Sequence, residues 1–480
     1  MNPNSYSHLL FLSIAVCLFW ALPRQGRKWF VLAASLVAYV ISEGLNIGIP
    51  LAMVAAAGAF SWLMFSRPDR KHLWYSLGIG TIVAILAFFK YRDFAVENLN
   101  ALLSSFSLPL LNIPRFRQLP LGISFCAFTA IAFLIDTFQG RIKRQTATDI
   151  TTFLTFWPTA LAGPILRFRE LGSQLSFKRD WDVSLLTRGL DRIVWGLVQK
   201  NLIANSLEAW VREGFLPQAA GVNSTVDTWF LALAFGLQIY FDFASYSNLA
   251  IGAAQLIGIT LPENFRFPYH ASTPADFWAR WHMSLSRWVR DYLFFPLSAR
   301  FREVGPPYYF SLIAVMALVG LWHGAGWGFV AWGVMHALYL ILFRMWQQFV
   351  ERTGDRFTNN IGIDIFWRVF VWVAVLAAWV PFRAATLGQA GQMLHSMFFE
   401  FRFGVSYSVN FYLATLLIAA FCIVEPYLCK RITGLDKIWS QGGLTQYVNP
   451  MFLRPVLYSL GLFLFIVLDD RDTGFIYFQF

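Results

Sequence analysis

The sequence predicts an all-α polytopic membrane protein. Of its 480 residues, 57% are hydrophobic and only 14% are charged, a balance too apolar for a water-soluble globule. The hydrophobic residues are grouped in runs close to the length that crosses a bilayer, and short basic groups separate several of these runs. We therefore expect about ten to twelve tilted transmembrane helices, together with shorter interfacial and re-entrant helices.

The N-terminal part of the chain contains five apolar runs that we predict as transmembrane helices. Several are slightly shorter than the roughly 20 residues that cross a bilayer at right angles, so we expect local thinning or shielding by neighbouring helices. No Lys or Arg precedes the first run, unlike the basic start of a cleaved signal peptide, so this run is expected to remain as a helix. The predicted spans are residues 7–22, 29–43, 45–65, 74–90 and 120–137.

Charges in the connecting loops predict the orientation. Basic residues follow the first, third and fifth runs, at residues 24–28, 67–71 and 141–144, whereas the loop after the second run offers only Glu43. Because cytosolic loops are enriched in Lys and Arg, the N-terminus is predicted to lie outside the cytosol. The net charge of +11 comes from such groups, a pattern that favours membrane orientation over a nucleic-acid partner.

Three stretches after the fifth run differ from simple spans. Residues 151–166 contain two prolines and a glycine, so we expect a re-entrant or buried segment whose irregular backbone is covered by protein. Residues 183–212 place charged side chains at helical spacing, which predicts an amphipathic helix. Residues 226–259 are either one long tilted helix or two segments around a polar break, and Asp242 within them is expected to meet a partner in the bundle.

The segment 261–300 is predicted to lie at the cytosolic interface and to form part of an active site. Prolines punctuate it and prevent a spanning helix. Its centre, Asp276 to Asp291, is predicted as an interfacial helix with Asp276 as a candidate N-cap. Asp291 is expected to pair with a nearby arginine. Candidate ligands for a cytosolic cofactor are Arg280, Arg287, Arg290 and Trp281, although the arginines can bind lipid headgroups instead.

Two histidines in aromatic and Gly-rich surroundings are the candidate catalytic residues. His323 ends one apolar run, 308–323, and a second run, 325–346, follows at once. A titratable ring at membrane depth costs free energy unless it has partners or a task. A neutral imidazole can take a proton from a hydroxyl and return it to a leaving group, which acyl transfer requires. His282, in the interfacial segment, is the second candidate, and the two histidines are expected to belong to one site.

Each candidate also has a structural interpretation. His323 can be a packed histidine bonded to a carbonyl, and His282 can anchor its helix at the headgroup level. His336, in the helix after His323, is a weaker candidate for function. The glycines around His323, including Gly320 and Gly333, permit close approach of helices, and packing is the expected role for each of them.

The remaining features complete a single membrane-embedded domain over residues 1–480. Further spans are predicted at 364–381, 408–428 and 452–468. The four cysteines lack metal-ligand spacing, so no metal site is predicted, and Cys422 with Cys429 is interpreted as helix packing rather than a disulfide. The absence of a Gly-x-Ser-x-Gly elbow and of a phosphate-binding loop argues against a serine hydrolase and a nucleotide-driven enzyme.

Several motifs, in a characteristic order, resemble the membrane-bound O-acyltransferase (MBOAT) family, in particular its bacterial polysaccharide and alginate O-acetyltransferase branch. Their order and spacing are more specific than any one of them. The motifs are FFKYRDF from Phe88, LPLGISFCAFTAIAFLIDTFQG from Leu119, FWPTALAGPILRF from Phe156, QIYFDFASYSNLAIG from Gln238, ENFRFPYHASTPADFWARWHMSLSRWVRDYLFFPL from Glu263, GLWHGAGWGFVAWGVMHAL from Gly320 and FIYFQF at the C-terminus.

The resemblance implies a ring of tilted helices around a central funnel. It matches His323 to the principal catalytic histidine of the family and His282 to its second active-site histidine. It also implies an acyl donor reached from the cytosol, with acetyl-CoA as the expected donor substrate and no permanently bound cofactor. The expected location is the bacterial plasma membrane, and the expected partners are membrane lipids, an extracytoplasmic acetyltransferase and a polysaccharide acceptor.

The predicted function is therefore transfer of an acetyl group from a cytosolic thioester across the membrane for O-acetylation of an exopolysaccharide such as alginate. Three alternatives stay open. One is D-alanyl transfer to teichoic acid from a carrier-protein thioester. Another is a non-enzymatic transporter or flippase, in which the histidines form a proton relay. The third is a non-catalytic scaffold in an exopolysaccharide export complex, for which replacement of His323 would leave function intact.

Overall fold

A computed structural model describes residues 5–116, 120–160, 163–219, 223–299, 305–353 and 361–432, and a few positions from 456 to 475. These residues form helices and loops and no strands, which confirms the all-α prediction for this part of the chain. The chain divides into two compact units, one of residues 1–192 and 249–262 and the other of residues 193–248 and 263–480. The prediction of a single domain stays a prediction.

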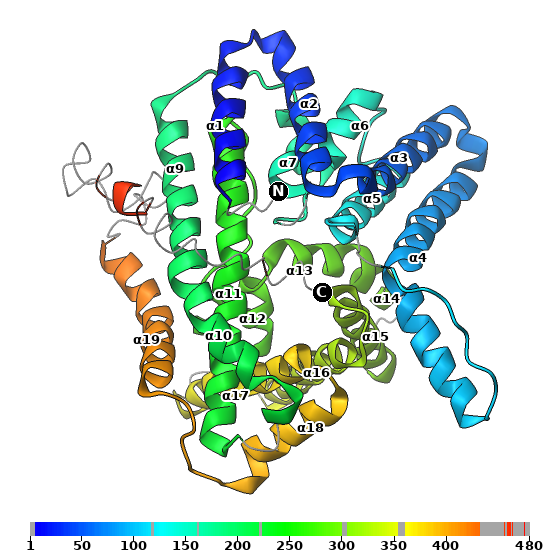
Figure 1. The fold of residues 1–480 in the computed structure, drawn as a ribbon. Coiled ribbons are helices and arrows are strands. Elements are labelled where there is room, and N and C mark those ends of the chain that lie inside the picture. Colours follow the sequence, from blue (N-terminus) through cyan, green and yellow to red (C-terminus); the bar gives the residue numbers. More distant parts are fainter. Residues whose placement is uncertain are drawn as a thin grey trace. The chain divides into compact units, whose positions relative to one another are not determined.

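The first unit is built from the five predicted N-terminal spans, each of which is a helix. The third, fourth and fifth of these pack against one another (Figure 1). The fourth helix continues well beyond the predicted 74–90, because the polar residues that follow keep helical spacing after the apolar run ends. The helices are α1 (Tyr6–Ala21), α2 (Arg24–Glu43), α3 (Gly48–Ser66), α4 (Lys71–Ser105) and α5 (Ile123–Phe138).

The broken segment predicted at 151–166 contains short helices in its described residues, and most of its side chains are buried, whereas a re-entrant path stays a prediction. The short helices are α6 (Ala147–Leu154), α7 (Trp157–Ala160) and, beyond it, α8 (Phe168–Leu171). Side chains of α2 satisfy the irregular backbone, since Ser35 Oγ accepts from the Trp157 amide at 3.2 Å and the Tyr39 hydroxyl donates to the Ala160 carbonyl at 3.0 Å. Such protection is what irregular backbone needs at membrane depth.

The second unit contains the candidate site. The long apolar stretch predicted at 226–259 is one continuous helix, which decides between the two interpretations left open by the sequence. Two of its helices are shared with the first unit, since α9 begins there and α11 ends there. The helices are α9 (Val183–Val198), α10 (Asn205–Gly214), α11 (Thr225–Leu256), α12 (Pro274–Arg280), α13 (Met283–Val289), α14 (Phe295–Ser298), α15 (Pro306–His323), α16 (Trp327–Thr353), α17 (Ile361–Arg383), α18 (Leu387–His395) and α19 (Val409–Ile432).

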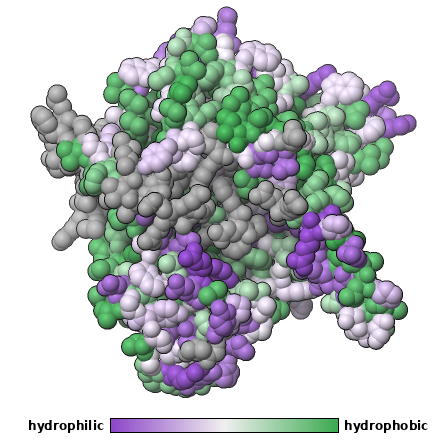
Figure 2. Space-filling view, viewed as in Figure 1, coloured by the Kyte–Doolittle hydropathy of each residue, from purple (hydrophilic) through white to green (hydrophobic). Residues whose placement is uncertain are grey.

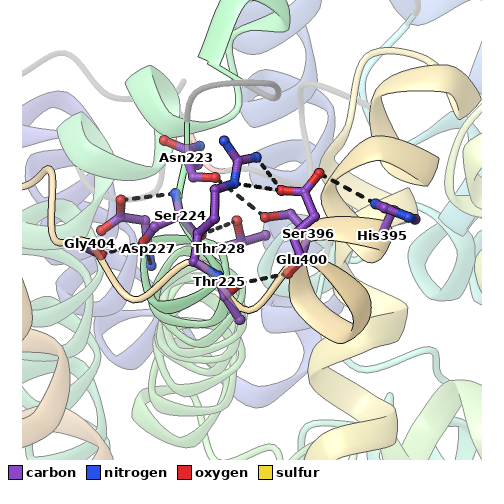
Figure 3. Close-up of polar contacts among 10 residues, drawn as sticks. Asn223, Ser224, Thr225, Asp227, Thr228, His395, Ser396, Glu400 and Gly404 are labelled. Carbon is purple, nitrogen blue, oxygen red and sulfur yellow. Dashed lines mark hydrogen bonds and ion pairs between the residues drawn. The ribbon is translucent and has the colours of Figure 1, made fainter.

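A network of hydrogen bonds ties the N-terminus of α11 to the loop before α19 (Figure 3). The Thr225 amide donates to the Arg402 carbonyl at 2.9 Å, and the Arg402 amide donates back to Thr225 Oγ1 at 3.0 Å. Asp227 accepts from the Ser406 amide at 3.2 Å and from the Tyr412 hydroxyl at 2.5 Å. These bonds fix the first turn of α11, which otherwise has unpaired backbone amides.

Helices α15 and α16 approach closely because two positions at their contact lack a side chain. A Cβ atom at Gly320 would lie 2.0 Å from the carbonyl oxygen of Phe329, and one at Gly333 would lie 2.1 Å from the carbonyl oxygen of Met316. Both distances are far shorter than a van der Waals contact, and the opposing atoms belong to the backbone, which cannot move aside as a flexible side chain can. The packing role expected for these glycines is therefore confirmed, and it places His323 beside α16.

Replacement of Gly333 by alanine is expected to destabilise the protein by about 1–3 kcal/mol, because the new methyl group forces the two helices apart. The matched control is Gly326→Ala, whose Cβ would meet nothing nearer than a ring carbon of Phe329 at 3.5 Å. Thermal unfolding of the purified protein in detergent measures both effects. A lower melting temperature is expected only for the Gly333 variant, and equal melting temperatures would contradict the close helix contact.

Several helices are suited to crossing a membrane. Among the described residues, five are long and apolar enough, namely Gly48–Ser66, Pro68–Ser105, Trp327–Thr353, Ile361–Arg383 and Val409–Tyr427, and two shorter apolar helices are Tyr6–Ala21 and Ile123–Phe138. Hydrophobic residues cover broad areas of the visible surface (Figure 2). Most of the span predicted at 452–468 and the side chain of Cys429 lie outside the described residues, and the number of helices in a ring stays a prediction.

Candidate active site

The interfacial segment does not form the single helix predicted from Asp276 to Asp291. It forms α12 and α13, which are separated at Trp281 and His282. The N-cap of α12 is Thr273 rather than Asp276, since Thr273 Oγ1 accepts from the Asp276 amide at 3.1 Å and Pro274 occupies the first helical position. The predictions of a single helix and of Asp276 as its N-cap were therefore wrong. The break between the two helices places His282 at their junction.

His282 occupies this junction in a left-handed backbone conformation, with φ of +41° and ψ of +55°. Residues other than glycine rarely adopt this conformation, and such positions are concentrated at functional sites. Its side chain is fully buried, with 0% of the residue exposed, so it does not act as a headgroup anchor. Burial lowers the pKa of His282 to about 3, which keeps the imidazole neutral at physiological pH.

Aromatic and polar side chains fix the His282 ring. The ring of Phe243, on α11, meets it edge to face with 4.6 Å between ring centroids. Its Nδ1 atom lies 3.0 Å from the side-chain oxygen of Asn264, which is also fully buried. An imidazole held on two sides in this way has one defined orientation.

His323 is the last residue of α15 and is 6% exposed. Its ring packs edge to face on Trp332 of α16, with 5.0 Å between centroids, and on Phe382 of α17, with 5.4 Å between centroids. The helix ends here because the next residue, Gly324, has an extended backbone. His323 is therefore enclosed by three consecutive helices and is held at the end of one of them.

The structure brings three histidines into one aromatic cluster. Trp322 contacts both His282, at 6.2 Å, and His323, at 4.8 Å between centroids. Trp332 contacts both His323 and His336, the latter at 4.9 Å. We call these five residues the histidine cluster. The sequence predicted that His282 and His323 share one site, and the packing supports this, whereas the proximity of the weaker candidate His336 was missed.

The candidate donor-binding residues have different surroundings. Arg280 pairs with Asp276 at 2.7 Å, and Arg290 pairs with Asp291 at 2.8 Å, as expected for Asp291. Burial raises the pKa of Asp276, but the bonds from Arg280 and from Ser272 outweigh it and leave this pKa below its ordinary value. Trp281 is buried and stacks on Phe277 with 5.5 Å between centroids.

Arg287 is partly exposed on α13. Of the three arginines, Arg280 and Arg290 hold their guanidinium groups against neighbouring carboxylates, so an incoming phosphate would compete with those carboxylates. Trp281 belongs to the aromatic packing around the site and not to its surface. The roles of these residues toward a donor stay predictions.

A buried ion pair joins the short π-helix after α9, residues Gln199–Ala204, to the middle of α11. Lys200 Nζ lies 2.6 Å from Asp242 Oδ1, and both residues are only 2% exposed. This pair confirms the expectation that Asp242 has a partner within the bundle. The sequence analysis did not identify Lys200. A single lysine in the apolar run 193–204 and a single aspartate in another apolar run could have predicted such a buried pair.

The fold and the cluster define a class: a multi-pass helical membrane protein with buried titratable rings between its helices. A sequence model of the membrane-bound O-acyltransferase family matches residues 73–382, a region that contains all three histidines of the cluster. The chain belongs to the membrane-bound O-acyltransferase family. The family and the acyltransferase class that the motifs indicated are thereby confirmed.

Three different activities are named among curated proteins that this chain resembles. A probable alginate O-acetylase of Azotobacter vinelandii is 33% identical over 440 residues, which cover 90% of this chain and 84% of that protein. A peptidoglycan O-acetyltransferase of Helicobacter pylori is 32% identical over 68% of this chain and 65% of its own. A teichoic acid D-alanyltransferase of Streptococcus thermophilus is 30% identical over 56% of this chain and 66% of its own.

Proposed function

We propose that the protein takes an acetyl group from a cytosolic thioester, acetyl-CoA, and passes it across the membrane for O-acetylation of an exopolysaccharide such as alginate. The similarity to a probable alginate O-acetylase over 90% of the chain carries this proposal. The D-alanyltransferase match, which covers only 56% of the chain, supports the alternative less well. The proposed location is the bacterial plasma membrane, with the N-terminus outside the cytosol.

In the proposed reaction His323 is the general base. Its imidazole removes the proton of an acceptor hydroxyl while the hydroxyl oxygen attacks the thioester carbonyl. The carbon–sulfur bond then breaks, and the imidazolium returns the proton to the departing coenzyme A sulfur. Acceptor O–H and thioester C–S bonds are exchanged for an ester C–O bond and a thiol S–H bond, so no further reactant is needed.

His282 is proposed to orient the donor or to assist the proton transfer. The two rings pack against this one tryptophan, which supports their action in a single site. Arg280, Arg287 and Arg290 are proposed to bind the phosphates of coenzyme A on the cytosolic side. Membrane lipids, an extracytoplasmic acetyltransferase and the polysaccharide are the proposed partners.

The test is consumption of radiolabelled acetyl-CoA by the protein in nanodiscs, with and without soluble polyol acceptors. The proposal predicts release of coenzyme A that increases when an acceptor is present. Parallel reactions contain an acetylated or D-alanylated carrier protein as the only thioester. Turnover of the acetylated carrier protein alone would replace acetyl-CoA by a carrier-protein thioester as the donor. Turnover of the D-alanylated carrier protein alone would favour the teichoic acid alternative, and turnover of none of the three thioesters would favour the transporter alternative.

A further inference from the structure

Asn264 is a buried residue in the loop between α11 and α12, and the proposed reaction gives it no role. The residue is 0% exposed, and its backbone carbonyl accepts from the Met283 amide at 2.8 Å. Its side-chain nitrogen donates to Ser247 Oγ on α11 at 3.1 Å. Asn264 thus joins α11 to the first turn of α13, next to His282.

The identity of the Asn264 side-chain atom that faces His282 follows from Ser284. The backbone amide of Ser284 points at Oδ1 of Asn264 at 3.3 Å, and the Ser284 hydroxyl lies 2.9 Å from the same atom. A backbone N–H can only donate, so the atom that receives it must be the amide oxygen rather than the amide nitrogen. This oxygen is also the atom 3.0 Å from His282 Nδ1.

The tautomer of His282 follows in turn. An amide oxygen only accepts hydrogen bonds, so the Nδ1 atom of His282 must donate and must carry the ring proton. In a neutral imidazole the other nitrogen, Nε2, then holds the lone pair that can accept a proton. We propose that Asn264 is a positioning residue, which holds His282 in the Nδ1–H tautomer and so makes Nε2 its proton-accepting nitrogen.

The surrounding geometry supports this role. The backbone of His282 is held in the left-handed region, and the bond from the Met283 amide to Asn264 anchors the residue that follows. Phe243 meets the ring edge to face and limits its rotation. The neutral state that burial imposes on His282 makes the choice of tautomer matter, because an imidazolium would carry protons on both nitrogens.

The expected effect of Asn264 on activity rests on the proposed function, whereas the assignment of the His282 tautomer is independent of it. If Nε2 of His282 assists proton transfer or contacts the donor, the loss of Asn264 lets the ring adopt the other tautomer. For metal-bound histidines, the loss of the partner that orients the ring through its second nitrogen costs about 10–100-fold, and we take this as the order of magnitude for His282. We therefore expect kcat for acetyl transfer to fall by this factor in Asn264→Leu, with a smaller change in KM.

Two variants of Asn264 test whether its side-chain oxygen determines the tautomer of His282. Asn264→Leu removes it at similar side-chain volume, and Asn264→Asp keeps an acceptor beside Nδ1, while the Ser247 hydroxyl can turn to donate to the new carboxylate. The matched control is Asn248→Leu, which removes another buried amide, bonded to Gln199 at 2.7 Å. This control separates loss of a buried amide from loss of the contact to His282.

The readout is the ¹⁵N NMR spectrum of protein labelled at histidine nitrogens, with His282 assigned by the signals that disappear in His282→Gln. Wild type, Asn264→Asp and Asn248→Leu are expected to show a protonated Nδ1 and an unprotonated Nε2. Asn264→Leu is expected to show the Nε2–H tautomer or a mixture. In Asn264→Asp the added charge is expected to raise the pH at which the ring becomes charged and to restore activity above that of Asn264→Leu.

An Nε2–H tautomer in wild type overturns the proposal even if Asn264→Leu fails to fold. An unchanged Nδ1–H tautomer in a folded Asn264→Leu overturns it as well. Failure of the proposed function is distinguishable, because the spectrum requires no turnover. A changed tautomer with full acetyl transfer would leave the positioning role intact and contradict the part assigned to His282 in the reaction.

Discussion

Replacement of His323 by glutamine is expected to lower the rate of acetyl transfer about 10²–10⁴-fold, the usual contribution of a general base. Glutamine keeps a polar side chain of similar length but cannot take a proton at physiological pH. His323 packs on Trp332 and Phe382, so glutamine retains part of the volume and limits collapse of the site. The measurement is kcat with labelled acetyl-CoA in nanodiscs.

The matched control is His72→Gln, which replaces an exposed histidine of the first unit. Its rate is expected to equal that of the wild type. The melting temperature of His323→Gln must also stay near that of the wild type for the loss to be assigned to chemistry. A folded His323 variant with the wild-type rate would remove this residue from the reaction.

Replacement of Lys200 by methionine is expected to destabilise the protein by about 3–5 kcal/mol, because it leaves the carboxylate of Asp242 buried without its cation. Both residues are 2% exposed, and the two charges lie 2.6 Å apart. Water cannot reach the remaining charge without disrupting the helices. The effect should appear as a large drop in melting temperature or in yield of folded protein.

The double variant Lys200→Met with Asp242→Leu tests this explanation. Removal of both charges eliminates the unpaired carboxylate, so the double variant is expected to recover most of the stability lost by Lys200→Met alone. Thermal unfolding of both variants in the same detergent provides the comparison. If the double variant is less stable than the single one, the pair contributes through interactions other than charge balance.

Hydrophobic patterning accounts for the agreement between sequence and structure in the first unit. Each of its five apolar runs became a helix, because long apolar segments have few other ways to satisfy their backbone in a membrane. The continuous α11 was harder to predict. Its interior Asp242 suggested a possible break, and the lysine that accommodates this residue lies 42 positions away in the sequence.

The interfacial segment shows where local patterns fail. One helix was predicted from Asp276 to Asp291, yet the backbone of His282 adopts the left-handed conformation and interrupts it. Long-range hydrogen bonds support that conformation, since the backbone amides of Met283 and Ser284 both donate to Asn264, and helical spacing contains no information about these bonds. The cap was mispredicted for a simpler reason, since Thr273 directly before Pro274 is a better start signal than Asp276.

The candidate site could be predicted in part. His282 and His323 were selected from chemistry and from their Trp- and Gly-rich surroundings, and the structure places both against Trp322. His336 was a weaker candidate although it lies in the same motif as His323, because its place in the histidine cluster depends on the packing of α16 against α15. Asn264 was missed because its importance lies in an atom-to-atom contact, which no spacing reveals.

The most direct test of the proposed function combines sidedness with chemistry in sealed proteoliposomes. Labelled acetyl-CoA is added outside, and a polyol or alginate acceptor is enclosed. The proposal predicts that label appears in the enclosed acceptor with the wild type and not with folded His323→Gln. Equal transfer by both proteins, or coenzyme A release with all label left outside, would contradict transfer across the membrane at His323.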